Sequence, residues 1–304
     1  MSDYLIHRSE HIVRDSSVTV LNGSAALNVL DRTVSTKLCE MGNLDTKKTL
    51  FCDSNGRIED MATVFMVDQQ ILLITSAEHG EATRKKLVDG IGWDEECILL
   101  NGDDAISHIS VICRDPTELL SLFGPGNVQL SKGKSLEFVD ILIHKTEFDS
   151  CDKVDILVPK AKFSSVMGKL KEFDSKVASE ERWDFIRISL GVPNIEDAQG
   201  NLPNEVGMDS LVNLDKGCYP GQEIHARIDS RGRTVKNLIR IKANTPIEIG
   251  IQKVEGIGKI RVTSTRIFSG VSLSLGICPI IDESVGEILL EDGSSAIVEP
   301  LIFP

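Results

Sequence analysis

The chain has 304 residues, 41% of them hydrophobic, which suffices for a buried core divided among two or three lobes. Its formal net charge of −13 argues against a general binder of nucleic acid or anionic membranes, because phosphate contacts need clustered Lys and Arg. No apolar run approaches the roughly 18 residues that cross a bilayer, and the first residues lack the layout of a signal peptide. We therefore expect a cytoplasmic protein that binds no membrane.

The sequence alternates between strand and helix patterns up to about residue 190. The expected elements are a strand at 16–22, a helix after Gly23 with Leu27, Leu30 and Val34 on its apolar face, a hairpin over 49–67, a strand at 71–74, a helix over 77–90, a helix after Asp115, strands at 137–143 and 154–158, and helices over 162–173 and 179–190. Thr75 or Ser76 is expected to cap the helix over 77–90, and Asp115 the helix that starts at Pro116. This alternation predicts a mixed α+β core.

From Val235 onward the helix pattern ends, and strand patterns rich in Val, Ile and Ser alternate with glycine turns. We therefore predict two domains, an α+β region of two lobes over 1–233 and an all-β domain over 234–304.

Seven cysteines are scattered without a Cys-x-x-Cys pair or a Cys/His spacing suited to zinc, so no metal site is predicted. Cys218 differs from the others in its setting. It follows the apolar stretch 211–214, read as a strand, and precedes Pro220-Gly221 and a short helical pattern from Gln222 to Arg227. A strand-turn-helix passage would expose its sulfur, and Lys216 with the helix dipole would favour the thiolate. The alternative is a small buried hydrophobe, the usual fate of an unpaired cysteine.

The only dense basic cluster of this acidic chain follows Cys218, and it could hold a small polyanion or be a solvated loop. Its members are Arg227, Arg231, Arg233 and Lys236. His225 could act as a base for Cys218, but a surface or core histidine is the more common outcome.

The octapeptide at 216–223, Lys-Gly-Cys-Tyr-Pro-Gly-Gln-Glu, resembles the Lys-Gly-Cys-Tyr-x-Gly-Gln-Glu signature of YgfZ-type proteins in the glycine-cleavage T-protein superfamily. Arg227 follows at the usual interval, and 187–193 and 202–205 precede it in the order typical of that family. More weakly, 53–60 resembles the T-protein turn with an Asp-Asp pair, and 258–264 resembles the family's Thr-Ser strand.

The resemblance implies a three-lobed cloverleaf with a central hole for tetrahydrofolate and a C-terminal β-barrel domain. It implies a folate-linked role in assembling or repairing iron-sulfur clusters, with client enzymes or assembly proteins as partners. The site residues implied are Cys218 and Lys216 for thiol chemistry and, for tetrahydrofolate, Asp60, Tyr219, Gln222, Glu223 and Arg227. The cluster itself is not expected to be bound, because nothing near Cys218 supplies the further thiolates.

One departure concerns the pterin. Ser189 stands where T-proteins carry a glutamate, and a hydroxyl cannot replace the two parallel hydrogen bonds of a carboxylate. Glu196 and Asp197 could substitute, although a solvated loop is the simpler expectation for both. Two alternatives therefore stay open: an aminomethyl- or methyltransferase of the T-protein type, and a non-catalytic adaptor that has lost folate. Whether the protein is an enzyme stays open as well.

Overall fold

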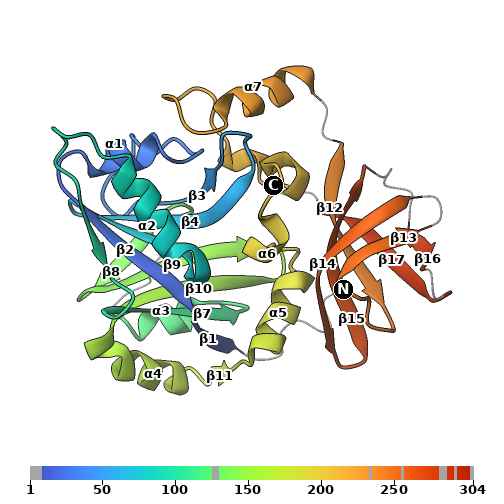
Figure 1. Cartoon of the computed structure of the whole chain (residues 1–304). Helices are drawn as coiled ribbons and strands as arrows, with labels where there is room; N and C mark the ends of the chain where they lie inside the picture. Colours follow the sequence, from blue (N-terminus) through green and yellow to red (C-terminus); the bar gives the residue numbers. More distant parts are fainter. Residues whose placement is uncertain are drawn as a thin grey trace. The chain divides into compact units, whose positions relative to one another are not determined.

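The structure is a computed structural model that describes residues 9–124, 130–232, 235–254, 257–280, 286–290 and 293–301 (Figure 1). The chain divides into two compact units. Unit 1 comprises the described residues of 1–49 and 60–179, and unit 2 those of 50–59 and 180–304. Arg233 and the domain boundary predicted between 233 and 234 lie outside the described residues.

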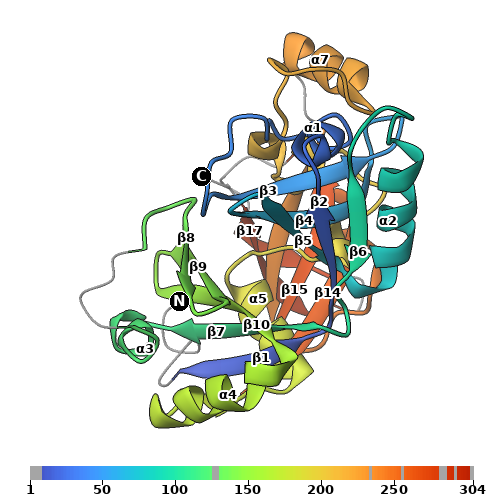
Figure 2. The ribbon, with the colours of Figure 1, turned by 90° about the vertical axis from the view of Figure 1, so that its left-hand side faces the viewer.

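The larger sheet of unit 1 has six strands in the order β11-β1-β7-β10-β9-β8. Their bounds are Glu10–Arg14 for β1, Ile106–Cys113 for β7, Ser135–Phe138 for β8, Ile141–Phe148 for β9, Cys151–Pro159 for β10 and Lys176–Val177 for β11. One face carries a core of buried Ile and Val residues packed on α3 (Thr117–Ser121) and α4 (Phe163–Glu172). Figure 2 shows both helices on the same side of this sheet.

The predicted strand at 137–143 is wrong, because two strands meet there. Val139 and Asp140 have φ of 49° and 65°, in the left-handed region, and they form the turn between β8 and β9. A two-residue hairpin turn of type I′ has positive φ at both central residues, and a valine gives no sequence signal for such a turn.

The second sheet of unit 1 has the order β3-β4-β5-β2-β6. Its strands are β2 (Ser16–Asn22), β3 (Thr46–Cys52), β4 (Ile58–Val67), β5 (Gln70–Ser76) and β6 (Ile98–Asn101). Val18, Phe65 and Ile74 of this sheet pack with Leu142 and Leu157 of the larger one, so the two sheets share a small core. The tip of the β3–β4 hairpin, residues 50–59, belongs to unit 2.

The helices of unit 1 are shorter than predicted. Helix α1 ends at Asp31, so Val34 is buried outside it. Residues 77–89 form the 3₁₀ turn η2 (Ala77–His79) and α2 (Gly80–Asp89), and the Ser76 side chain does not cap them. Asp115 does accept the Thr117 amide at 2.8 Å, but α3 starts at Thr117 rather than Pro116. The remaining bounds are Ala26–Asp31 for α1 and Lys160–Lys162 for the 3₁₀ turn η3.

Unit 2 contains a six-stranded antiparallel sheet in the order β13-β14-β15-β12-β17-β16. The strands are β12 (Lys236–Ala243), β13 (Gly250–Val254), β14 (Gly258–Phe268), β15 (Val271–Pro279), β16 (Glu287–Leu289) and β17 (Ser295–Pro300). Ile239, Ile241, Ile260 and Val298 are among the buried residues of its core. An all-β C-terminal part, as predicted, is confirmed.

The helices of unit 2 precede this sheet in the chain. They are α5 (Glu180–Ser189), α6 (Ile195–Ala198), η4 (Pro203–Val206), η5 (Asp209–Leu211) and α7 (Gln222–Arg231). The strand predicted at 211–214 is wrong, since the chain bends from η5 to α7 without one. No helix in the described ranges is long and apolar enough to span a membrane.

Candidate functional site

Cys218 is exposed. Of the other six cysteines, Cys39 alone is exposed as well. It lies in the loop between η5 and α7, three residues before Gly221, the N-cap of α7. Neighbouring Gly217 is exposed and Tyr219 is buried, so the chain turns inward directly after the thiol. The buried-hydrophobe alternative is therefore wrong for Cys218, although no strand leads to it.

The side chain of Gln222 holds the loop around Cys218. Its amide nitrogen donates to the carbonyl oxygen of Lys216 at 3.3 Å and to that of Leu214 at 3.5 Å. The Lys216 ammonium lies 5.4 Å from the centre of the Tyr219 ring, within the range of a cation–π contact. Three predicted site residues, Lys216, Tyr219 and Gln222, are thus brought together in one loop.

A buried chain of hydrogen bonds anchors Tyr219. Gly56 O can only accept, so His225 Nε2 carries a proton and donates to it at 2.8 Å. Burial lowers the pKa of His225, which favours the neutral ring. Its Nδ1 therefore accepts the Tyr219 hydroxyl at 3.2 Å, and burial raises the pKa of that hydroxyl. Both ring nitrogens are engaged, so His225 acts as a structural core histidine.

Two glycines let the Cys218 loop approach the β3–β4 turn. Gly221 has φ of 84°, and a Cβ there would lie 2.5 Å from Gly56 Cα. Gly56 has φ of 73°, and a Cβ there would lie 2.8 Å from His225 Nε2. Asp53 shapes the facing turn by accepting the amides of Asn55 and Arg57, each at 2.8 Å. The sequence analysis identified both turns but did not predict that they touch. The only sequence signal for this contact is that each turn contains a glycine, Gly56 in one and Gly221 in the other.

Glu223 and Arg227 lie on the exposed side of α7 and pair with each other at 3.1 Å. An exposed pair one helical turn apart contributes little to stability, so both side chains can exchange this partner for a ligand. Of the remaining basic cluster, Arg231 is exposed and Lys236 pairs with Glu205 at 3.4 Å.

Asp60 belongs to unit 1 and is buried. Its Oδ1 accepts the Met61 amide at 2.8 Å, and its Oδ2 accepts the Thr83 hydroxyl at 2.9 Å. A longer bond of 3.4 Å comes from the Ser76 amide. Burial raises the pKa of Asp60, although these hydrogen bonds oppose the shift.

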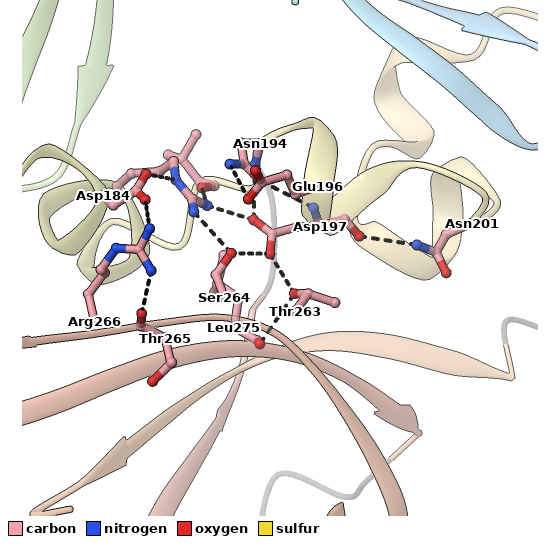
Figure 3. A network of polar contacts seen from close by, with 12 residues as sticks. Asp184, Asn194, Glu196, Asp197, Asn201, Thr263, Ser264, Thr265, Arg266 and Leu275 are labelled. Atoms are coloured by element: carbon pink, nitrogen blue, oxygen red, sulfur yellow. Dashed lines mark hydrogen bonds and ion pairs between the residues drawn. The ribbon is translucent and has the colours of Figure 1, made fainter. Parts of the chain in front are cut away.

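Asp197 is fully buried and lies in no solvated loop (Figure 3). Its Oδ2 accepts from Arg187 Nη1 at 2.6 Å and from the Asn194 amide at 3.1 Å. Its Oδ1 accepts from the hydroxyls of Ser264, at 2.6 Å, and Thr263. With both oxygens occupied, Asp197 has no capacity to grip a pterin.

Neither of the other two residues considered for the pterin, Ser189 and Glu196, is placed as a buried carboxylate that could hold it. The Ser189 hydroxyl donates to the carbonyl oxygen of Ile186 at 2.6 Å, within its own helix. Glu196 is exposed. Within the described ranges, no group of three or more His, Cys, Asp or Glu side chains is placed to hold a metal ion.

No family model matches the sequence, and no curated protein matches it. Among solved structures, the fold is similar to glycine cleavage system aminomethyltransferase T from Bartonella henselae. The TM-score is 0.82 at 16% identity over 98% of this chain and 86% of that chain. A weaker match is heterotetrameric sarcosine oxidase from Corynebacterium sp. U-96, at 15% identity over 57% of this chain and 87% of that chain, with a TM-score of 0.38. The predicted α+β fold of the T-protein type, with its C-terminal β domain, is thereby confirmed.

Proposed function

We propose that this protein is a YgfZ-type, tetrahydrofolate-binding protein that supports the assembly or repair of iron-sulfur clusters in client enzymes. The observation that carries the proposal is the exposed Cys218 thiol in a loop fixed from both sides. Gln222 holds the chain before it, and Tyr219 with His225 anchors the chain after it. Two glycines with positive φ and a buried histidine hold the loop that presents this one exposed thiol, which supports a chemical role for the thiol.

In this proposal Cys218 supplies the thiol, and Lys216 positions the loop through the Tyr219 ring. Glu223 and Arg227 face solvent one turn into α7, where a guanidinium can pair with a carboxylate of a bound anion. Tyr219 and Gln222 contribute through the shape of the loop, because their polar atoms already bond within it.

Tetrahydrofolate binding rests on the fold, because the residues at the expected pterin grip do not fit it. Ser189 bonds within α5, and Asp197 is saturated by Arg187, Asn194 and two hydroxyls. Folate is therefore assigned no part in the thiol chemistry of Cys218. Asp60 of unit 1 remains the carboxylate proposed for the ligand, because its Oδ2 accepts one hydrogen bond, from Thr83, where each oxygen of Asp197 accepts two.

Replacing Cys218 by alanine tests the role of the thiol. In cells that lack the protein, the variant is expected to fold normally and to leave the activity of iron-sulfur enzymes unrestored. Cys39→Ala, at the other exposed cysteine, is the matched control and should restore it. Full rescue by Cys218→Ala would refute the proposal.

Calorimetric titration with tetrahydrofolate tests the ligand separately. Saturable binding that Arg227→Gln weakens and Lys259→Gln, at an exposed lysine of β14, leaves unchanged is the expected result. No binding by the native protein would favour the adaptor that has lost folate.

A second candidate function is aminomethyl transfer to tetrahydrofolate, which the similarity to an aminomethyltransferase over 98% of the chain favours. The test is incubation with an aminomethylated lipoyl carrier and tetrahydrofolate. Methylene-tetrahydrofolate that forms in the native protein but not in Asp60→Asn would support it, and its absence would reject it.

A further inference from the structure

One face of the six-stranded sheet of unit 2 packs against helices. Helix α5 contacts β14 and β15, and α6 contacts β14, where Asp197 Oδ1 accepts the Ser264 hydroxyl at 2.6 Å (Figure 3). Ser264 pairs with Leu275 of β15. Arg261 of β14 pairs with Ile277, two residues further along β15, so Arg261 points to the same face as Ser264.

Beyond Arg261 this face continues onto β13, where its side chains are exposed. Register pairs Ile251 of β13 with Arg261, and Lys253 with Lys259. Residues two apart on a strand point to the same side of the sheet, so both pairs lie on this face. All four side chains are exposed, and Ile251 keeps 66% of its accessible surface. We call these four residues the edge surface.

The edge surface is basic in a chain whose formal net charge is −13. Lys253 and Lys259 lie directly opposite each other, and like charges in that arrangement destabilise a sheet. Among the residues that the structure describes, no Asp or Glu forms an ion pair with either lysine. Arg261 Nη2 donates to the neutral side chain of Asn201 at 2.6 Å. A ligand with carboxylates would therefore relieve the repulsion on this surface.

The backbone of β13 adds a second means of recognition. In the strand order β13 comes first, so within the described ranges it has β14 as its one neighbour. Every second residue of such an edge strand directs its N–H and C=O groups away from the sheet, where an extended peptide can bond to them. Pairing with the same edge of a second copy would bring lysines against lysines, whereas a strand with Asp or Glu side chains meets no such repulsion.

We propose that the edge surface binds an extended, acidic segment of a partner protein, which joins the sheet as a strand beside β13. Lys253 lies next to the added strand, and Lys259 is one strand further, within reach of its flexible stem. An apolar side chain two residues from the paired acid packs on Ile251. This recognition uses neither Cys218 nor folate, so it goes beyond the function proposed above.

Fluorescence polarisation with a labelled synthetic peptide of alternating Glu and Val tests the surface. Saturable binding is expected, and Lys253→Glu should weaken it by at least about tenfold, because repulsion replaces a charge-assisted contact. Ile251→Ser should also weaken it, without a change of charge. The matched control is Lys85→Glu, at an exposed lysine of α2 in unit 1, which should leave the affinity unchanged.

The fold of the Lys253→Glu variant is checked by thermal denaturation. The substitution turns the Lys253–Lys259 pair into a pair of opposite charges, so the melting temperature should not fall. Weaker peptide binding by a variant of unchanged stability then reports the loss of the contact itself.

A second peptide, N-methylated at two adjacent central residues, separates strand addition from charge attraction. Adjacent residues direct their N–H groups to opposite sides of a strand, so one of the two methyl groups removes a donor that faces β13. The charge and the side chains are unchanged, and weaker binding than that of the first peptide is expected. Equal binding of the two peptides would overturn the addition of a strand.

Three further outcomes would overturn the proposal. They are absence of saturable peptide binding, equal weakening by Lys253→Glu and Lys85→Glu, and tighter binding of a labelled oligothymidylate than of the peptide, which would indicate a nucleic-acid surface instead. Sedimentation velocity of the protein alone completes the test. Self-association that Lys253→Glu abolishes would assign the edge surface to a second copy of this chain, not to a partner protein.

Discussion

At the scale of single residues, hydrogen-bond partners decide what each polar side chain can do. Tyr219 lies in the signature segment and His225 two residues after it, where either could contact a ligand. Instead the tyrosine donates to the histidine, and the histidine donates to a backbone carbonyl of the facing turn. Their hydrogen bonds fix the loop, and the thiol of Cys218 stays exposed.

The neutral state of His225 predicts a pH dependence of stability. Its folded pKa lies below the unfolded value near 6.5, so the unfolded chain binds a proton first as the pH falls. The stabilisation by His225 is therefore present above about pH 6.5 and is lost below it. His225→Gln removes this contribution while the other buried histidines remain.

Urea denaturation between pH 5 and pH 7.5 measures the effect. The difference in the free energy of unfolding between the native protein and His225→Gln should shrink as the pH falls. A difference that stays constant, or grows on acidification, would contradict a neutral His225.

At the scale of elements, two turns from distant parts of the sequence meet backbone to backbone. The turn at 53–57 is closed by Asp53, and the Cys218 loop ends at Gly221, the N-cap of α7. Each glycine has positive φ and almost no space beside its Cα. The glycines of the signature are thus required by geometry at 221, whereas Gly217 has open space around it.

Gly221→Ala should therefore destabilise the protein by about 2 kcal/mol or more, from strained φ and a clash with Gly56. Gly217→Ala, in the same loop, has nothing within 4 Å of the added methyl and should be close to neutral. Chemical denaturation gives both values. Equal stability of the two variants would show that the turns do not meet as described.

At the scale of the whole molecule, one buried carboxylate ties together segments of unit 2 that lie far apart in the sequence. Asp197 of α6 bonds to Arg187 of α5 and to Thr263 and Ser264 of β14 (Figure 3). Arg187 also donates to Ser264 and, through Nε, to Asp184. Two segments that resemble family motifs at the sequence level, 187–193 and 258–264, thus meet in one structural network.

Asp197→Asn should cost about 3 to 5 kcal/mol, because it leaves Arg187 buried without its main counter-ion. Glu196→Gln, one residue earlier and exposed, should leave the free energy of unfolding unchanged. Thermal or urea denaturation of the two variants measures both changes in the free energy of unfolding. A neutral effect of Asp197→Asn would mean that the network does not hold α5 and α6 on the sheet.

The sequence predicted where most elements lie, because apolar periodicity is a local property. It failed where a local signal is missing or misleading. Val139 and Asp140 form a turn without glycine, and 211–214 is apolar without pairing as a strand. Both cases depend on partners elsewhere in the fold, which outweigh the propensity of the segment itself.

By itself, the sequence determined the α+β class and the all-β C-terminal part, since these follow from patterns within a few dozen residues. Only the tertiary structure decided that Cys218 is exposed, that His225 serves the core and that Asp197 is saturated. Burial and hydrogen-bond partners come from residues as far apart as Gly56 and His225, and no local pattern specifies such contacts.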